Sequence, residues 1–473
     1  MNSTRYQANL DERSGYLRHA SVKKFGITTM TDGATIQKHP LLNFMGACVV
    51  WPKALFLKCV DCTDHLAAGG SKDAEYVTEH MLSSLRSLPH PRYVDLIICD
   101  GAGDMKKFRY LIEGVFSWLY TIWCISHILN LVMKKAASHK KIDEIIKKGK
   151  KIVDRFGGSI HFEHSLFVTT SAKFLGLEFI NYVEPRFGLY FLMLHRLDVL
   201  KPTLLACVNS PAYAQKQFED DDEATIINDS GFWKDVKQLV KLTWPLMKLI
   251  RYGDERIRPT LHLVYTEALK AEERLEAAGS DVLDGGGAAL LEAFLHYKEH
   301  ICSDIAMAAS LCDTKTWAND ELRNVPECKA KLVEYIESFE EQYEEKEGFS
   351  TKAQEEMLCY LNGEGVFSRP VVRADARNMS ARRFFDKYEA SVPHFSRVAL
   401  PGPVSTISRR IYHDIVGTLR ASSVALERWN GTGRTPNTSM IRKETAQRPK
   451  NARSSSRATT FWVPDMASWN RDK

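Results

Sequence analysis

The amino-acid sequence predicts an α/β protein in which a mixed β-sheet comes first and a long all-helical segment follows. Three runs rich in β-branched and aromatic residues lie close together between residues 27 and 60, and a fourth, apolar throughout, covers 93–99. From about 165 to 380 the strand patterns disappear and apolar residues recur at helical spacing. The length of 473 residues and the 44% hydrophobic content suit two or three globular domains.

The expected elements follow in a simple order. Strands are predicted at 27–35, 43–51 and 54–60, the last two joined as a hairpin around Pro52 and Lys53. After the hairpin, helix and strand alternate: a helix at 73–88, a strand at 93–99, a helix at 104–115, a strand at 119–124 and a helix at 125–137. This β-β-β-α-β-α-β-α order is that of RNase H-like folds, and some other α/β folds share it.

Composition divides the chain into five parts. We expect a polar segment at 1–25, the first part of the sheet domain at 26–164, a helical insertion at 165–380, a return to the sheet domain at 381–430, and a basic, disordered tail at 431–473. Within the insertion, Trp233 and Trp244 fall on one helix face and are expected in its core. The charged stretch 331–348 is expected to form an exposed helix.

Charge and apolar content exclude several classes of protein. No apolar run is long enough to cross a membrane, and residues 1–25 lack the apolar stretch of a secretory signal. The ten cysteines form no disulfide framework, which fits reduced thiols in the nucleus or cytoplasm. The net charge of +5 is uneven, with basic stretches at 134–151 and 428–473. Such stretches neutralise phosphates, although for each one alone a solvated helix face or a disordered tail is the favoured interpretation.

Two aspartates are candidates for metal chemistry. Asp32 lies in the first predicted strand, and Asp100 ends the fourth. In an RNase H-like sheet these strands are neighbours, so the two carboxylates would meet at one edge and favour a shared divalent cation. Two Mg²⁺ ions held in this way activate water and stabilise the leaving oxygen of a phosphodiester. The alternative is that both Asp-Gly pairs simply form turns at strand ends.

Two cysteine–histidine clusters are possible metal ligands. Cys124 and His127 are three residues apart on one helix turn, and Cys59-x-x-Cys62 precedes His65. Zinc needs four such ligands, and neither cluster has a second pair suitably placed. Packing and hydrogen bonding are therefore the favoured roles, and no zinc finger is evident.

Three segments resemble the catalytic region of hAT transposases: TDGAT, LIICDGAGDMKK and WCISHILNLVMKK. The likeness is strongest to the variety that carries a domain of unknown function before the hAT dimerisation region. It covers residues 20–200 well and 380–430 weakly. The resemblance implies an acidic triad of Asp32, Asp100 and Glu427, the last in ASSVALERWN, holding Mg²⁺ or Mn²⁺. It also implies that His127, in the Cys-x-x-His motif, lies near the active site.

The resemblance further implies a DNA contact at Arg186 and Phe187, where the family has an aromatic residue that stacks on a flipped base. A core aromatic is the alternative for Phe187. Glu427 also has an alternative, an exposed helix glutamate, because about twenty residues (401–420) separate the family's lead-in from ASSVALERWN, and Trp429-Asn430 departs from the pattern. Upstream of the first strand no zinc-finger pattern is present, so we expect a truncated or domesticated derivative.

Three hypotheses remain at the level of sequence. The leading one is a nuclear, hAT-like transposase-derived protein whose ancestral activity is Mg²⁺-dependent DNA cleavage and strand transfer. DNA is then the expected partner, with a possible homo-oligomer and no small-molecule substrate. The second is a non-catalytic nuclear scaffold that retains the RNase H-like fold and binds DNA or proteins. The third is a structure-specific nuclease acting on RNA or hybrid duplexes.

Overall fold

The structure is a computed structural model that describes residues 15–18, 20–36, 38–48, 51, 54–99, 105–158, 162–174, 176–182, 188–215, 222–253, 260–279, 281–320 and 325–399.

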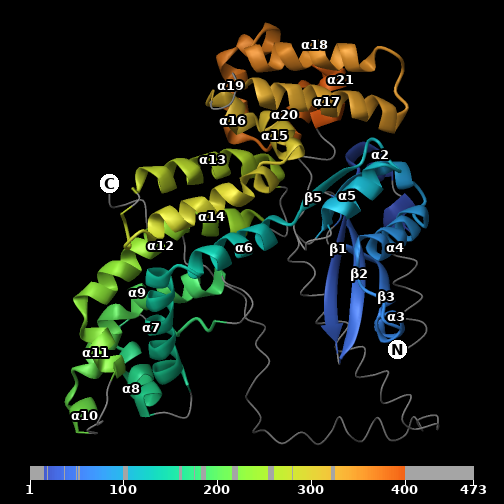
Figure 1. Cartoon of the computed structure of the whole chain (residues 1–473). Coiled ribbons are helices and arrows are strands. Elements are labelled where there is room, and N and C mark those ends of the chain that lie inside the picture. The colour runs from blue at the N-terminus through green and yellow to red at the C-terminus, as the bar shows by residue number, and fades with distance from the viewer. Residues whose placement is uncertain are drawn as a thin grey trace, which may run out of the picture. The chain divides into compact units, whose positions relative to one another are not determined.

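A single five-stranded mixed sheet forms the α/β part (Figure 1). Its strands are β1 (Ile27–Ile36), β2 (His39–Ala47), β3 (Leu55–Asp61), β4 (Val94–Cys99) and β5 (Tyr120–Trp123). Their order across the sheet is β3-β2-β1-β4-β5. The pairs β1–β2 and β2–β3 are antiparallel, whereas β1–β4 and β4–β5 are parallel. The predicted fold class, a mixed sheet of the RNase H-like kind combined with a large all-helical region, is confirmed.

The strand sequences explain most of this arrangement. All six residues of β4 are buried. The continuous apolar run of this segment predicted that burial, because a central parallel strand is covered on both faces. The second strand was predicted four residues too late, because β2 begins at His39. Its register with β1 extends to the pair Ile36↔His39, and Lys38 has a positive φ of 70° in the tight connection between them. The predicted pairing of the second and third strands is confirmed, although Pro52 and Lys53 lie outside the described residues.

Helices α4 (Ala74–Arg86) and α5 (Met105–Glu113) pack on each other and on the sheet. The Thr121 hydroxyl of β5 donates a hydrogen bond of 2.9 Å to Glu113 of α5. Because side chains alternate along a strand, this contact places α5 on the sheet face of Thr121, the one opposite Ile122.

Helices and no strands occupy the described residues after β5. They are α6 (Ile125–Ala137), α7 (Lys140–Gly157), α8 (Phe162–Ser171), α9 (Gly188–Val208), α10 (Pro211–Ala214), α11 (Asp222–Asn228), α12 (Ser230–Gly253), α13 (Leu261–Ala277), α14 (Gly286–Ile301), α15 (Asp304–Leu311), α16 (Thr314–Ala318), α17 (Pro326–Tyr343), α18 (Phe349–Asn362), α19 (Pro370–Asn378), α20 (Ala381–Tyr388) and α21 (Pro393–Ala399). Short helices α2 (Ala20–Phe25) and α3 (Thr63–Ala67) and the 3₁₀ turn η1 (Pro91–Tyr93) belong to the α/β part. None of the described helices is long and apolar enough to span a bilayer.

The helical region packs directly onto α6 and α7. Helix α6 contacts α12 and α14, and α7 contacts α9. A Cβ atom added at Gly149 of α7 would lie 2.7 Å from the Leu194 side chain of α9, so the two helices approach too closely there for a larger residue. Trp233 is buried at 3% exposure, as predicted for the core. Trp244 is only half-buried and stacks on His195 with ring centroids 5.2 Å apart.

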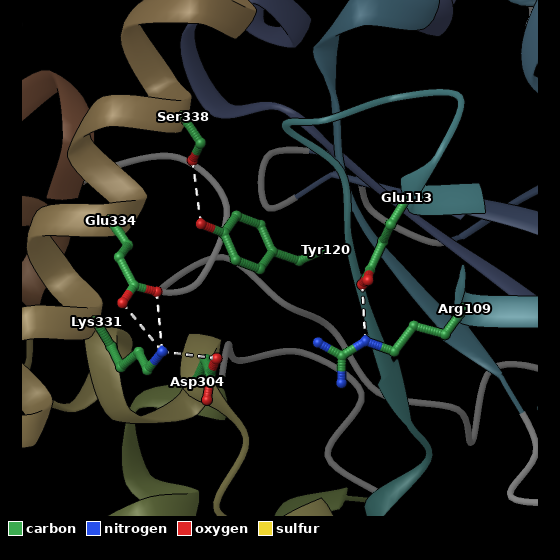
Figure 2. Close-up of polar contacts among 7 residues, drawn as sticks. All are labelled: Arg109, Glu113, Tyr120, Asp304, Lys331, Glu334 and Ser338. Atoms are coloured by element: carbon green, nitrogen blue, oxygen red, sulfur yellow. Dashed lines mark hydrogen bonds and ion pairs between the residues drawn. The ribbon is translucent and has the colours of Figure 1, made fainter. Parts of the chain in front are cut away.

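Helix α17 corrects the prediction of an exposed helix at 331–348. Its charged residues occupy one face, while Leu332, Ile336 and Phe339 on the other face are at most 2% exposed. Figure 2 shows Tyr120 of β5 directed at Ser338 of α17, with their oxygens 3.1 Å apart. The same view shows Lys331 between the carboxylates of Asp304 and Glu334, at 3.1 and 2.9 Å.

Candidate functional site

A narrow pocket opens on one face of the sheet, where β1, β2 and β4 lie side by side. Eight residues line it: Met30, Thr31, Asp32, Asn43, Met45, Ile98, Cys99 and Cys124. Seven of them come from the three strands, and Cys124 precedes α6. The pocket therefore contains Asp32, the first acid predicted to carry chemistry.

Strand register explains why these side chains converge. Asp32 is directly opposite Asn43 across the antiparallel β1–β2 pair. Met30 is opposite Ile98 across the parallel β1–β4 pair. Because side chains alternate along a strand, Met30 and Asp32 point to the same sheet face, as do their partners. A shift of one residue would move Asp32 to the opposite face.

The pocket is apolar except around Asp32. Met45, Ile98 and Cys99 are each at most 8% exposed. Asn43 is 2% exposed, and Asp32 is half-buried beside it. In such surroundings a carboxylate attracts a cation more strongly than it would in bulk water. Carboxylate and amide oxygens are also the ligand types that Mg²⁺ and Mn²⁺ prefer. Asp32 and Asn43 supply one carboxylate and one amide to the pocket, and the described part of the chain contains no group of three His, Cys, Asp or Glu side chains placed to hold a metal ion.

The other predicted acids cannot be placed in the same way. Asp100 follows Cys99, the last residue of β4, directly in the sequence. Asp100, Glu427, Arg186 and Phe187 all lie outside the described residues. The structure therefore locates one residue of the predicted triad and leaves the predicted DNA contact untested.

The Cys-x-x-His motif begins at the pocket. Cys124 is 3% exposed and lines it, and its backbone N–H donates to the carbonyl of Cys99 at 2.8 Å. His127 is half-buried in the first turn of α6 and is not among the lining residues. The motif thus contributes its cysteine to the pocket wall.

Helices α9 and α12 lie directly against this motif, which no pattern in the sequence indicated. The Asn130 side chain of α6 accepts a hydrogen bond of 3.3 Å from the backbone of Gly188, where α9 begins. Ser126 donates to the carbonyl of Ile250 in α12 at 3.4 Å. The start of α6 is therefore anchored to two helices from distant parts of the sequence.

A stacked aromatic pair lies at the end of β5. Trp123, which directly precedes Cys124, stacks on His300 of α14 with ring centroids 3.8 Å apart. Burial is the main cause that lowers the pKa of His300, with Glu299 opposing it and Lys106 and Arg109 adding to it. No sequence pattern links these rings, because 177 positions separate them.

The cluster of Cys59, Cys62 and His65 has a local explanation. Cys62 is fully buried, and its thiol lies 3.6 Å from the carbonyl of Val60. Burial is the main cause that raises the pKa of Cys59, which disfavours the thiolate that a metal requires. The His65 ring stacks on Tyr76 at 4.0 Å and lies 2.8 Å from the carbonyl of Ser71. These contacts agree with the packing and hydrogen-bonding roles favoured from the sequence.

Acidic side chains pair with several lysines in the basic stretch 134–151. The pairs are Lys135–Glu292 at 3.1 Å, Lys141–Asp235 at 2.7 Å, Lys147–Asp143 at 2.6 Å and Lys151–Asp222 at 2.8 Å. This arrangement supports the interpretation of the stretch as a solvated, internally neutralised helix face.

The strand order and the pocket define an RNase H-like α/β domain with an acidic residue on its central strands. Residues 12–152 match the family described as "Domain of unknown function (DUF659)", which is characteristic of hAT-like transposase-related proteins. The matched region contains the whole sheet, Asp32 and the Cys-x-x-His motif. No curated protein matches the chain. The match covers the part of the chain in which the pocket lies, and it suggests a relation to transposase-related proteins.

Proposed function

We propose that the protein is an hAT-like, transposase-derived nuclear protein that binds DNA and whose ancestral activity is metal-dependent DNA cleavage and strand transfer. One observation carries the proposal: Asp32 lies in a pocket on β1, next to β4, and Asp100 directly follows the last residue of β4. The family match of residues 12–152 supports it.

In this proposal Asp32, Asp100 and Glu427 hold Mg²⁺ or Mn²⁺. When bound, the ion lowers the pKa of water and stabilises the leaving oxygen of a phosphodiester. Asp32 is suited to its part because the pairing of its backbone with Asn43 of β2 places its side chain on the pocket face of the sheet. His127 lies near this site, Arg186 and Phe187 contact the DNA, and subunits associate as a homo-oligomer.

The metal site is tested by calorimetric titration of the full chain with MnCl₂. We expect two bound ions in the wild-type protein and loss of that binding in Asp32→Asn and in Asp100→Asn. Asp64→Asn is a matched control, since Asp64 is exposed on α3, away from the pocket-lining residues. A folded wild-type protein that binds no Mn²⁺ would overturn the proposed chemistry.

The alternative is a non-catalytic scaffold that uses the same fold to bind partners. The paired lysines of α6 and α7 favour it, because they leave fewer cations for phosphates on that face. If the protein forms DNA hairpins from a nicked duplex, and if this reaction requires Mg²⁺ and Asp32, the protein is an enzyme. Mn²⁺ binding without any cleavage of DNA, RNA or hybrid duplexes would decide for the scaffold.

A further inference from the structure

The solvent-facing side of α5 carries an exposed aromatic ring next to two cations. Tyr110 is 79% exposed, and Lys106 and Arg109 are exposed as well. Residues three and four positions apart are neighbours on a helix surface, so these three side chains lie together and form the α5 face. Phe108 and Ile112, on the other side of the helix, are fully buried. Their burial fixes the helix so that the Tyr110 ring stays in solvent.

The two cations of the α5 face differ in their surroundings. Arg109 donates from Nε to Glu113 at 2.8 Å, as Figure 2 shows. A guanidinium carries five N–H donors, so this one bond orients the group without using its terminal nitrogens. Lys106 has no acidic partner among the residues that the structure describes, whereas its neighbour Lys107 pairs with Glu75. The α5 face therefore retains positive charge.

Helix α5 adjoins the carboxyl ends of the parallel strands. Cys99 and Trp123, the last residues of β4 and β5, are Cα partners, so both strands end at the same edge of the sheet. Helix α5 packs on β5 and begins at Met105, shortly after the end of β4. In α/β sheets, ligands bind outside this edge. The α5 face is thus close to the edge at which Asp100 follows β4.

The stacked pair of Trp123 and His300 lies at the same edge, and both residues are half-buried. Burial is the main cause that lowers the pKa of His300, and Glu299 opposes this shift. Lys106 and Arg109 add to it, because a nearby positive charge disfavours protonation of the ring. The cations of α5 therefore lie within electrostatic reach of the aromatic pair.

Cations beside exposed aromatic rings suit a single-stranded nucleic acid. The cations follow the phosphates, and a ring stacks on a base, whatever the base, because every base has a π-face. In a duplex the bases already stack on one another, so a surface ring finds no free base. A lone exposed tyrosine would need no explanation, but here it adjoins cations at a sheet edge that suits ligands.

We infer that the α5 face binds single-stranded DNA, with Tyr110 stacked on a base and Lys106 and Arg109 on the adjacent phosphates. The inference rests on the proposed function, because it gives the DNA strand a second contact beside the proposed active site. It adds a surface that is separate in sequence from Arg186 and Phe187.

Fluorescence anisotropy of the full chain with a labelled oligonucleotide of about 20 thymidines tests the stacking. EDTA in the buffer keeps metal chemistry out of the measurement. Tyr110→Ala is expected to raise the Kd by about 5- to 100-fold, whereas Tyr110→Phe keeps the ring and should stay close to the wild type. Phe174→Ala, at a 49% exposed position beyond α8, is the matched control and should bind like the wild type. Thermal unfolding checks that the variants are folded.

The salt dependence of the same binding tests the phosphate contacts. Lys106→Gln is expected to reduce the slope of log Kd against log salt concentration by about 0.7, the value for one phosphate contact on a single strand. Lys237→Gln, at an exposed position of α12, is its control and should leave the slope unchanged.

The outcomes separate this inference from the proposed function. Wild-type protein that does not bind the oligonucleotide overturns both the proposed DNA binding and the role of the α5 face. Wild-type binding that Tyr110→Ala and Lys106→Gln leave unchanged overturns the α5 face alone. A blunt duplex bound as tightly as the single strand, with the same loss in Tyr110→Ala, overturns the preference for single strands. Asp32→Asn should bind the oligonucleotide like the wild type, so a failure of the proposed metal site would leave this inference standing.

Discussion

His300 illustrates how one residue connects the helical region to the end of β5. Its ring stacks on Trp123, and burial is the main cause that lowers its pKa. In an unfolded chain a histidine has a pKa of about 6.5. Between that value and the lower folded value, the unfolded state binds more protons than the folded state. The free energy of unfolding therefore falls as the pH decreases through this window.

We predict that His300→Gln weakens this pH dependence. The wild-type melting temperature should fall between pH 7.5 and pH 5, and the variant should lose less over the same range. Calorimetric or fluorescence melting at both values of pH measures the difference. His90→Gln, at an exposed position outside α14, serves as the control and should retain the wild-type pH dependence. Identical losses in His300→Gln and the wild type would contradict the prediction.

The candidate site also shows how far sequence reasoning reaches at this scale. Asp32 was recognisable because TDGAT lies in a strand pattern. Asn43 was not recognised from the sequence, because a single asparagine in a strand indicates no function until the strand register shows that it lies opposite an acid. The predictions for Asp100 and Glu427 remain predictions.

At the scale of elements, α17 holds the amino-terminal end of β4. The Gln342 amide donates to the carbonyl of Arg92 and to the Asp95 carboxylate, both at 2.7 Å. The Arg92 guanidinium donates back to the carbonyl of Gln342 at 2.7 Å. Tyr343 adds a hydrogen bond of 3.1 Å to Asp95, and burial raises the pKa of Tyr343 well above its usual value, which keeps it a donor. Asp95 is 3% exposed, so these donors lie around a buried carboxylate.

We predict that Gln342→Leu destabilises the protein by about 2 kcal/mol, because it removes a donor from a buried carboxylate. Urea unfolding, followed by circular dichroism, measures the change. Gln354→Leu on α18 is the matched control, since the side-chain contact of Gln354 is exposed and it should change the free energy of unfolding by less than about 0.5 kcal/mol. Equal effects of the two substitutions would show that the contact with β4 contributes little.

The elements differ in how well the sequence predicted them. The helix at 125–137 was predicted with the bounds of α6, because its apolar period and its limits are local. The beginning of β2 was missed, because pairing with β1 recruits residues whose own pattern is weak. The buried face of α17 was missed as well, because the many charged residues of this segment concealed an apolar face that packs on α15 and α18. Local signals therefore predicted the type of each element, and packing between elements decided burial.

For the molecule as a whole, these contacts imply that the matched region 12–152 does not form an independent folding unit. The apolar side of α6 includes Ile128, Leu129 and Val132, all fully buried, and α6 packs against α12 and α14. Helix α7 likewise packs against α9, and β4 depends on α17. Removal of the later helices would expose these surfaces to water, which costs roughly 25 cal/mol for each Å² of apolar area.

We predict that a fragment of residues 12–158 lacks cooperative thermal unfolding and binds the dye ANS, because its helices keep their apolar faces without partners. A fragment of residues 12–399 retains α9, α12, α14 and α17 and should melt cooperatively, close to the full chain. Calorimetry and near-ultraviolet circular dichroism compare the three proteins. If the short fragment unfolds cooperatively at the temperature of the full chain, the sheet domain is independent of the helices, and the anchoring of α6 and β4 described above contributes nothing to its stability.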